Sequence, residues 1–358
     1  MRLQFAPRNP FARTAWNFSS KIDVQYKIQR RQLRLSHPDQ HYCNSLLKYF
    51  KQRAIDLKSD NIKINLFFCD DKAKVKVGEP GFAISSGVRG RVTIAPTSTT
   101  LVAGDHDMNK TSLTPSVTLH ATIPRTVEES FVRGEVNVTV NDSVFESSNP
   151  FRHASSLVKL MSGKENTNII MQYTDGGVDH RNTLQSVQAA AICIFKELNL
   201  DMLILARCAP GQSWRNPAER IMSLLNLGLQ NCALQRESCD DAMEKLLKKC
   251  GSMSDIRIEA AKKPELRDAF QQSIEPVQSL IRNRFARLKL KDEAVSVSDP
   301  VSDLEIDTLK RHLRELFPDL DLGKLVKSHT DKVDSYKTWK EKHCRERQYI
   351  FQIRKCQP

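Results

Sequence analysis

Apolar side chains along this chain follow two spacings, and the change between them predicts a mixed α/β protein. In some short stretches they fall at every second position or form brief runs, which is typical of strands. In others they recur every three or four positions, which is typical of amphipathic helices. Strands are predicted at 62–69, 116–123, 134–140, 168–173 and 201–207, and helices at 151–162, at 184–198 and from 216 onward. This order predicts one mixed sheet flanked by helices.

A further helix is predicted before these strands, from His41 to Leu57. It belongs to a basic N-terminal segment, residues 1–58, that we expect to be only partly helical. The buried stripe expected for this helix consists of Tyr42, Leu46, Tyr49, Phe50 and Ala54.

The last third of the chain changes to charged helices, and no strand is predicted there. An apolar stripe from Leu266 to Leu288 predicts a helix that is broken or kinked at Pro276. That stripe either packs on the α/β part or forms an oligomerisation surface, and packing is the expected role. The polar stretch 292–303 is typical of a linker, and a short helix that ends before Pro318 follows it. The chain is thus divided into a basic segment at 1–58, an α/β domain at 59–240 and an α-helical region at 241–358.

An acidic side chain follows the predicted strand 168–173. The sequence Asp175, Gly176, Gly177 is typical of a tight turn, so Asp175 is expected at the end of a buried strand. A carboxylate in this place either serves a functional site or is an ordinary turn Asp, because Asp side chains often bind the backbone two residues on.

Another acidic side chain lies in the first turn of a predicted helix. Asn216 is the expected N-cap of that helix and Pro217 its first residue, which places Glu219 in the first turn. Crossover connections join parallel neighbours, so Glu219 is expected to fold back toward Asp175. A structural explanation competes with a functional one, since Asn216 and Glu219 also have the spacing of a capping box.

The first predicted strand also ends in acids. Its apolar residues alternate from Ile62 to Phe68, and the strand runs into Asp70 and Asp71. Asp70 continues the period of two, whereas Asp71 falls on the opposite face of the sheet. Parity alone leaves either acid as the ligand of a site, and both can also be solvated charges at a strand end.

Taken together, these residues resemble the Asp-Asp-Glu triad of DDE transposases and retroviral integrases, which have a ribonuclease H-like fold. The likeness extends over roughly residues 60 to 235. A long insertion separates the first two acids, and Asp179 with His180 has no counterpart in the family. The stretches most similar to bacterial insertion-sequence transposases are Asp-Asp-Lys-Ala-Lys at 70–74, Asp-Gly-Gly at 175–177, Pro-Gly-Gln-Ser at 210–213 and Asn-Pro-Ala-Glu at 216–219.

The resemblance implies that Asp70, Asp175 and Glu219 are the catalytic residues and the metal ligands, with Asp71 at a variable position. It implies two Mg²⁺ or Mn²⁺ ions, which prefer oxygen ligands and promote DNA cleavage and strand transfer without a covalent enzyme intermediate. Asp70 would bridge both ions, Asp175 would bind one and Glu219 the other. The implied partners are transposon ends and target DNA, and a homo-oligomer is compatible with this activity.

Further residues are candidates for nucleic-acid contact. Lys72 follows the first acid closely enough to touch a phosphate. Gly176 and Gly177 would let the backbone approach DNA, although a simple turn explains these glycines equally well. The basic N-terminal segment offers Arg30, Arg31 and Arg34, which either contact phosphates or form a solvated basic face.

The charge of the chain favours a polyanionic partner. The net charge is +13 over 358 residues, with a pI near 9.3. Residues 1–58 contain 12 Lys and Arg against 3 Asp and Glu, so +9 of that charge lies there. Nucleic acid is the expected partner, and an anionic membrane surface is the second choice.

The nine cysteines are odd in number and lack C-x-x-C spacing, which predicts reduced thiols in the nucleus or cytoplasm. No apolar run approaches the roughly 20 residues of a membrane span, and the first residues lack the apolar segment of a signal peptide. Cys344 and Cys356 could supply at most half of the ligands of a zinc site.

Two alternative functions stay open. The chain is either an active enzyme or a transposon-derived protein that binds nucleic acid or protein and no longer cuts. Hydrolase chemistry based on His153, His180 or Cys208 is the weaker alternative, because no G-x-S-x-G sequence accompanies these residues.

Overall fold

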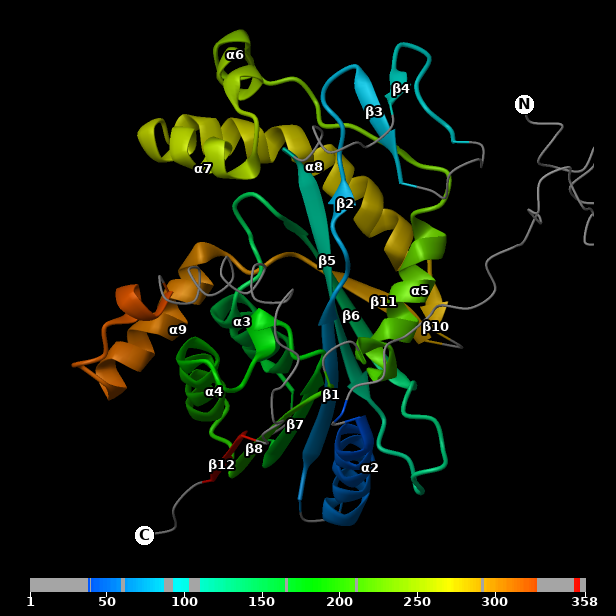
Figure 1. Cartoon of the computed structure of the whole chain (residues 1–358), viewed down its shortest axis with the longest axis vertical. Coiled ribbons are helices and arrows are strands. Elements are labelled where there is room, and N and C mark those ends of the chain that lie inside the picture. Colours follow the sequence, from blue (N-terminus) through cyan, green and yellow to red (C-terminus); the bar gives the residue numbers. More distant parts are fainter. Residues whose placement is uncertain are drawn as a thin grey trace, which may run out of the picture. The chain divides into compact units, whose positions relative to one another are not determined.

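A mixed β-sheet lies at the centre of the structure, with helices on both of its faces (Figure 1). The computed structural model describes residues 38, 40–58, 62–86, 93–102, 110–164, 167–209, 212–290, 293–326 and 351–354, all within the unit His37–Pro358. The helices are α2 (Gln40–Leu57), α3 (Pro150–Met161), α4 (Gln185–Glu197), α5 (Ala218–Gly228), α6 (Asp241–Lys249), α7 (Met253–Lys262), α8 (Glu265–Ala286) and α9 (Asp303–Leu316). The strands are β1 (Ile64–Asp71), β2 (Val75–Lys76), β3 (Phe82–Ser85), β4 (Thr100–Val102), β5 (Ser112–Ala121), β6 (Gly134–Asp142), β7 (Ile169–Thr174), β8 (Met202–Arg207), β9 (Ala233–Leu234), β10 (Lys289–Leu290), β11 (Glu293–Ser298) and β12 (Phe351–Arg354).

The strand order of the central sheet is β10-β11-β6-β5-β1-β7-β8-β12, and β2 also pairs with β5. β1, β5 and β6 are antiparallel neighbours, whereas β7 and β8 run parallel to β1. Because antiparallel strands come first and helix-linked parallel strands follow, this layout is consistent with a ribonuclease H-like sheet. The predicted mixed α/β fold and the predicted order of its elements are confirmed. A separate small sheet, β4-β3-β9, is built largely from the long insertion after β1.

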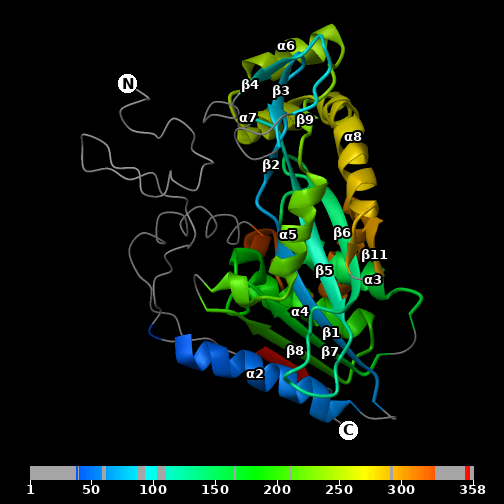
Figure 2. The ribbon, with the colours of Figure 1, turned by 90° about the vertical axis from the view of Figure 1, so that its right-hand side faces the viewer.

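Side chains of β1 alternate between two apolar cores. Leu66 and Phe68 belong to the core under α2, α5 and α8, whereas Phe67 and Cys69 belong to the core under α3, α4 and α9. Figures 1 and 2 show these two groups of helices on opposite faces of the sheet. Since the period of two continues to the end of the strand, its last residues also point to different faces.

The buried stripe of α2 differs from the predicted one. Tyr42 and Tyr49 are 72% and 71% exposed, while Cys43 and Leu47 are buried together with the correctly predicted Phe50 and Ala54. The helix is therefore rotated relative to the expectation. Two overlapping apolar stripes are present in the sequence of α2. The stripe that packs toward β1 contains Cys43 and not the two tyrosines.

The polar stretch predicted as a linker contains a strand of the central sheet. β11 pairs in parallel with β6, with Val295 opposite Val136 and Val297 opposite Val138. The expectation of a strand-free region after residue 240 was therefore wrong. Only two valines alternate within a serine-rich stretch, so the pairing partner decides the structure more than the local sequence does.

Helix α8 continues through Pro276, so the predicted break does not occur. Ile274, Ile281 and Phe285 are fully buried, and they pack in the core formed with β6 and β11, which confirms the predicted packing role of this stripe. Pro276 lacks an amide hydrogen and removes one backbone hydrogen bond, and tertiary contacts stabilise the helix on both sides of it. Among the helices of the described residues, none is both long and apolar enough to cross a bilayer.

The packing of α8 predicts a large difference between two neighbouring substitutions. Ile281→Ala removes a fully buried side chain and is expected to lower the free energy of unfolding by about 2–5 kcal/mol. Leu280→Ala removes a side chain that is 42% exposed and should cost less than about 1 kcal/mol. Urea titrations of both variants measure this difference, and equal losses would contradict the packing described above.

Candidate functional site

The carboxyl ends of β1 and β7 bring Asp70 and Asp175 side by side. The two strands pair in parallel with Cys69 opposite Thr174, so the next residue on each strand is the predicted acid. The thiol of Cys208, just after β8, donates to the carbonyl oxygen of Asp175 at 2.8 Å. Backbone pairing across three strands therefore sets the positions of both acids.

Asn216 fastens the beginning of α5 to the end of β1. Its Nδ2 donates to the carbonyl oxygen of Cys69 at 2.9 Å, and its Oδ1 accepts from the amide of Ala218 at 3.2 Å. Asn216 is only 1% exposed, so water competes little for either bond. These bonds hold Glu219, in the first turn of α5, at the same end of the sheet as Asp70.

The three predicted carboxylates lie close enough to influence one another. Asp70 is 7% exposed, and burial together with the negative charges of Asp175 and Glu219 raises its pKa to about 9. Asp70, Asp175 and Glu219 therefore lie near one another at this end of the sheet, although their carboxylate oxygens are not all within 4.8 Å of one another. Asp71 lies on the other face of the sheet, so Asp70 is the acid of this pair that joins the other two.

The Asp-Gly-Gly turn orients the second acid. The amide of Gly177 donates to Asp175 Oδ1 at 2.8 Å, which is the local bond expected of a turn Asp. Gly176 has φ +76°, and a Cβ there would lie 3.1 Å from Cδ of Arg207. Glycine is therefore required by the turn itself, and the same turn fixes the direction of the Asp175 carboxylate.

The expected capping by Asn216 and Glu219 does not form. Helix α5 begins at Ala218 with Pro217 as its N-cap, and the amide of Asn216 donates to the carbonyl oxygen of Ser213 at 2.7 Å. The Asn216 side chain binds the Ala218 amide and the Cys69 carbonyl, and its backbone amide makes no hydrogen bond with Glu219. The structural explanation of Glu219 as half of a capping box is therefore wrong.

Lys72 lies beside Glu219, in agreement with its predicted position near the site. Burial lowers the pKa of Lys72, and the charge of Glu219 opposes that effect. Its Nζ donates to Oδ1 of Asn226 on α5 at 2.6 Å. The ammonium group therefore adds positive charge at the edge of the three carboxylates.

Several predicted residues lie outside the described residues. They are Pro210 and Gly211 of the loop before α5, the basic candidates Arg30, Arg31 and Arg34, and the cysteines Cys344 and Cys356.

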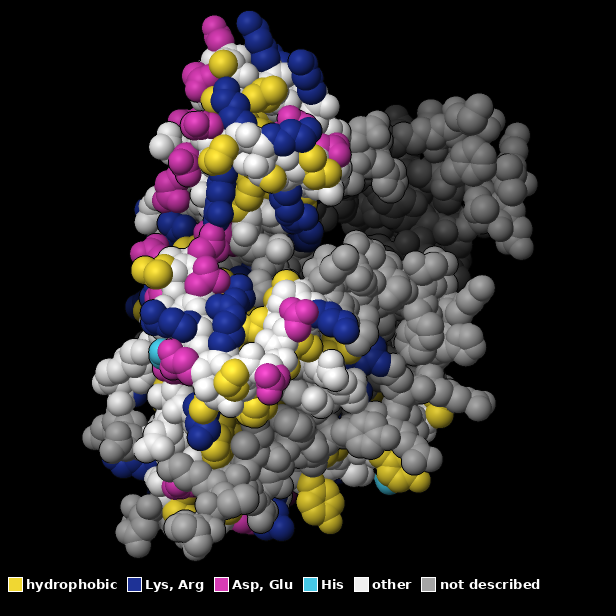
Figure 3. Space-filling view, turned by 90° about the vertical axis from the view of Figure 1, so that its left-hand side faces the viewer, with side chains coloured by type: hydrophobic (Ala, Val, Ile, Leu, Met, Phe, Trp, Pro, Cys, Tyr) yellow, Lys and Arg dark blue, Asp and Glu magenta, His cyan; other side chains and the backbone are white. Residues whose placement is uncertain are grey.

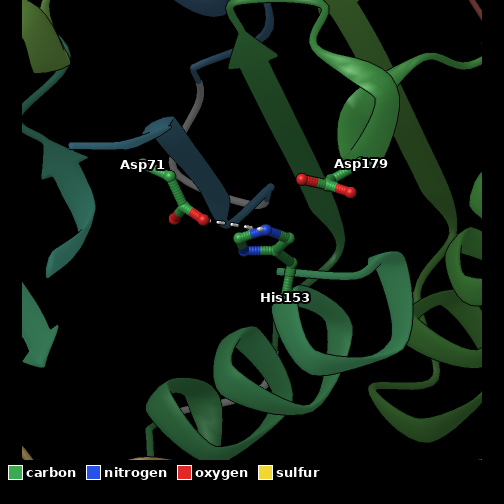
Figure 4. A group of neighbouring side chains, drawn as sticks. All are labelled: Asp71, His153 and Asp179. Atoms are coloured by element: carbon green, nitrogen blue, oxygen red, sulfur yellow. Dashed lines mark ion pairs between the residues drawn. The ribbon is translucent and has the colours of Figure 1, made fainter. Parts of the chain in front are cut away.

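Asp71 takes part in a second polar group, on the α3 side of the sheet (Figure 4). Its Oδ2 accepts from Arg152 at 2.8 Å and from Ser148 at 2.7 Å, and it lies 3.7 Å from Nε2 of His153. Asp71, His153 and Asp179 each offer a ligand atom within 4.8 Å of the other two, and this group can hold a metal ion. The Asp179 carboxylate comes from the turn η2 (Val178–His180), which follows β7.

Burial and charge act in opposite directions within this second group. Burial lowers the pKa of His153 to about 3, although Asp71 opposes that shift. Burial acts to raise the pKa of Asp71, but the charge of Arg152 and hydrogen bonds from Ser116 and Ser148 outweigh it, so the pKa of Asp71 is lowered. The group therefore combines a neutral imidazole with an ionised carboxylate.

Sequence reasoning singled out the members of this second group without joining them. Asp71 was the open alternative to Asp70, His153 was a weak hydrolase candidate, and Asp179 had no family counterpart. Their only sequence signal was position, since Asp71 ends a strand and Asp179 follows one.

Comparison with known proteins identifies no family for this chain. It matches no protein-family model, no curated protein and no solved structure. The function is therefore inferred from the residues themselves and from their geometry.

The bonds of Asn216 predict a measurable cost of its removal. Asn216→Ala leaves the buried carbonyl of Cys69 without its donor and should lower the free energy of unfolding by about 1–3 kcal/mol. Asn226→Ala, which removes an exposed amide on the same helix, should change it by less than about 0.5 kcal/mol. Chemical denaturation measures both, and an equally small loss in the two variants would show that the Asn216 bonds do not hold α5.

The like charges around Asp70 predict a pH-dependent stability in the metal-free protein. Folded Asp70 keeps its proton up to about pH 9, whereas the unfolded chain releases it near pH 4, so stability should fall as pH rises between these values. Asp70→Asn removes this dependence and should be more stable than the natural protein at about pH 8. Denaturation in the presence of a chelator tests this, and parallel pH profiles would contradict it.

Proposed function

We propose that the chain is a divalent-metal-dependent polynucleotidyl transferase that cleaves DNA phosphodiester bonds and joins the resulting ends. The observation that carries this proposal is the convergence of Asp70, Asp175 and Glu219 from the ends of two parallel strands and the beginning of a helix. Convergent carboxylates repel one another, and a divalent cation offsets that repulsion. The resemblance to DDE transposases supports the same assignment on the same residues.

The donor set fits Mg²⁺ or Mn²⁺. All three side chains offer oxygen, which is what these hard cations prefer, and no sulfur or imidazole is among the three. Asp70, Asp175 and Glu219 would hold the ions. Two such ions supply activation of the attacking oxygen and stabilisation of the leaving oxygen.

The surrounding residues of the chain prepare this site for its task. The amide of Gly177 restricts Asp175, and the Asn216 bonds restrict the first turn of α5, so the ligands are oriented before a cation binds. Lys72, next to Glu219, places an ammonium group where it can attract a phosphate of the substrate.

Exposed groups next to the site support a nucleic-acid substrate. Trp214 is 43% exposed, and the Arg215 guanidinium lies 4.5 Å from the centre of its ring. Both residues precede Glu219 by a few positions, and aromatic and guanidinium planes are surfaces on which bases stack. On the face drawn in Figure 3, positive and negative side chains of the described residues are interspersed. The basic segment 1–58 is therefore the main source of attraction for DNA in this proposal.

The thiols support a nuclear or cytoplasmic location. Cys43, Cys69, Cys193 and three others are free and buried, and Cys239 is free and half-buried, so the described cysteines form no disulfide. Reduced buried thiols are usual where glutathione and thioredoxin act.

The activity is tested with supercoiled DNA and with linear duplex ends in the presence of Mg²⁺ or Mn²⁺. Asp70→Asn, Asp175→Asn and Glu219→Gln are each expected to lower nicking or joining by at least about a hundredfold, because each removes a metal ligand. Glu129→Gln, at an exposed acid in the β5–β6 connection, is the matched control and should keep full activity. DNA binding without cleavage by the natural protein, under all metal conditions, would favour the inactive binding protein instead.

A further inference from the structure

We propose that Asp71, His153 and Asp179 form a second metal centre, which binds a transition-metal dication of the Zn²⁺ class. This proposal is independent of the proposed DNA chemistry, because none of its ligands belongs to the group of Asp70, Asp175 and Glu219. The two groups lie on opposite faces of the end of β1.

Three separate elements supply the ligands. Asp71 ends β1, His153 lies in the first turns of α3, and Asp179 lies in η2. Figure 4 shows the His153 ring between the two carboxylates, and the ligand atoms are within 4.8 Å of one another. Ligands about 2 Å from one ion are at most about 4 Å apart, so these side chains must move slightly toward one another to hold an ion.

Two buried polar atoms of this region point to a missing partner. Arg152 and Ser148 use Oδ2 of Asp71, while Oδ1 is buried and receives no well-formed hydrogen bond from the described residues. Nε2 of His180 is likewise buried without a hydrogen-bond partner in the described part of the chain. Its ring centre lies 4.3 Å from that of His153. Orphaned buried polar atoms are uncommon, and a cation is one partner that satisfies a lone pair.

The donor set selects the class of ion. One imidazole nitrogen and two carboxylate oxygens suit Zn²⁺ and similar transition-metal ions, whereas Mg²⁺ prefers oxygen alone. His180 lies in the same turn as Asp179 and is the candidate for a fourth ligand. Arg152 competes for Asp71, but it binds only Oδ2 and thereby orients the carboxylate, which is the role of hydrogen bonds behind metal ligands.

A cavity beside α3 borders one of the proposed ligands. A cavity of about 200 Å³ is lined by His153 together with polar side chains of β5 and β6, such as Ser116 and Thr139. Its lining also includes Lys159 and Asp299, which are exposed by 46% and 84% at their side chains, so the cavity reaches the surface.

A bound ion would tie together the segments that carry the first site. It would link η2 to the ends of β1 and α3, and η2 begins directly after the turn that orients Asp175. Asp71 is also the chain neighbour of Asp70. Occupancy is therefore expected to rigidify the strand ends that present these two acids.

The test uses the full-length, untagged protein after removal of metal with a chelator. Zn²⁺ binding is measured by calorimetry, and Co²⁺ serves as a spectroscopic probe of the ligand type. Asp179→Asn, His153→Gln and His180→Gln are compared with His41→Gln and Glu129→Gln, which change exposed residues. Asp70→Asn separates this centre from the proposed catalytic one.

We expect Asp179→Asn and His153→Gln to lose one equivalent of Zn²⁺ or to bind it at least about tenfold more weakly. The two control variants and Asp70→Asn should retain that equivalent, and the Co²⁺ spectrum should lack the intense thiolate band of cysteine ligands. If Asp70→Asn still binds this equivalent of Zn²⁺ and the natural protein shows no DNA cleavage, the second metal centre is supported and the proposed function is not.

The proposal is overturned if Asp179→Asn binds Zn²⁺ with unchanged stoichiometry and affinity, or if the Co²⁺ spectrum shows thiolate ligation at the only site. Circular dichroism identifies a variant that has not folded. If His153→Gln fails in this way, Asp179→Asn in the half-buried turn decides the outcome.

Discussion

The parallel pairing of β1 with β7 is the constraint on which both groups of side chains depend. Strands that run parallel end at the same edge of a sheet, so the residue after Cys69 and the residue after Thr174 become neighbours without any attraction between their side chains. Their charged side chains would in fact repel each other, because both residues are acids. Backbone hydrogen bonds and the two apolar cores on either side of β1 must supply the free energy that holds them together.

The alternation of side chains along β1 then separates two adjacent acids. Asp70 shares a face with Leu66 and Phe68, and Asp71 shares one with Phe67 and Cys69. The charges that act on Asp70 are those of other carboxylates, while Asp71 meets an imidazole, a guanidinium and a hydroxyl. Their pKa values move in opposite directions for this reason. Two adjacent residues thus lie in two different environments. A shift of β1 by one residue would move each side chain to the opposite face of the sheet.

The sequence predicted the order of elements because that order depends on local signals, and the same signals place each of the three acids at the end of an element. Hydrophobic periodicity marks each element, and glycine or proline marks the ends at which Asp175 and Glu219 lie. The misses have a common cause, which is that a partner in space decides them. β11 is a strand because β6 offers it a free edge, and α2 buries Cys43 in place of Tyr42 because of the face that β1 presents. Asp71, His153 and Asp179 are far apart in sequence and belong to three elements, so no spacing links them.

The buried carboxylates also limit what this fold can gain in stability. Asp70 at the end of β1 costs free energy in the absence of a cation, since burial and repulsion by Asp175 and Glu219 disfavour its charged form. A sequence selected for stability alone would have apolar or amide side chains at positions 70 and 175. The neighbouring core positions already have apolar side chains. The turn at Gly176 and the Asn216 bonds add further restraint at this end of the sheet, where a simpler loop would suffice for folding. In the proposed function, a bound dication would compensate this charge with few additional groups.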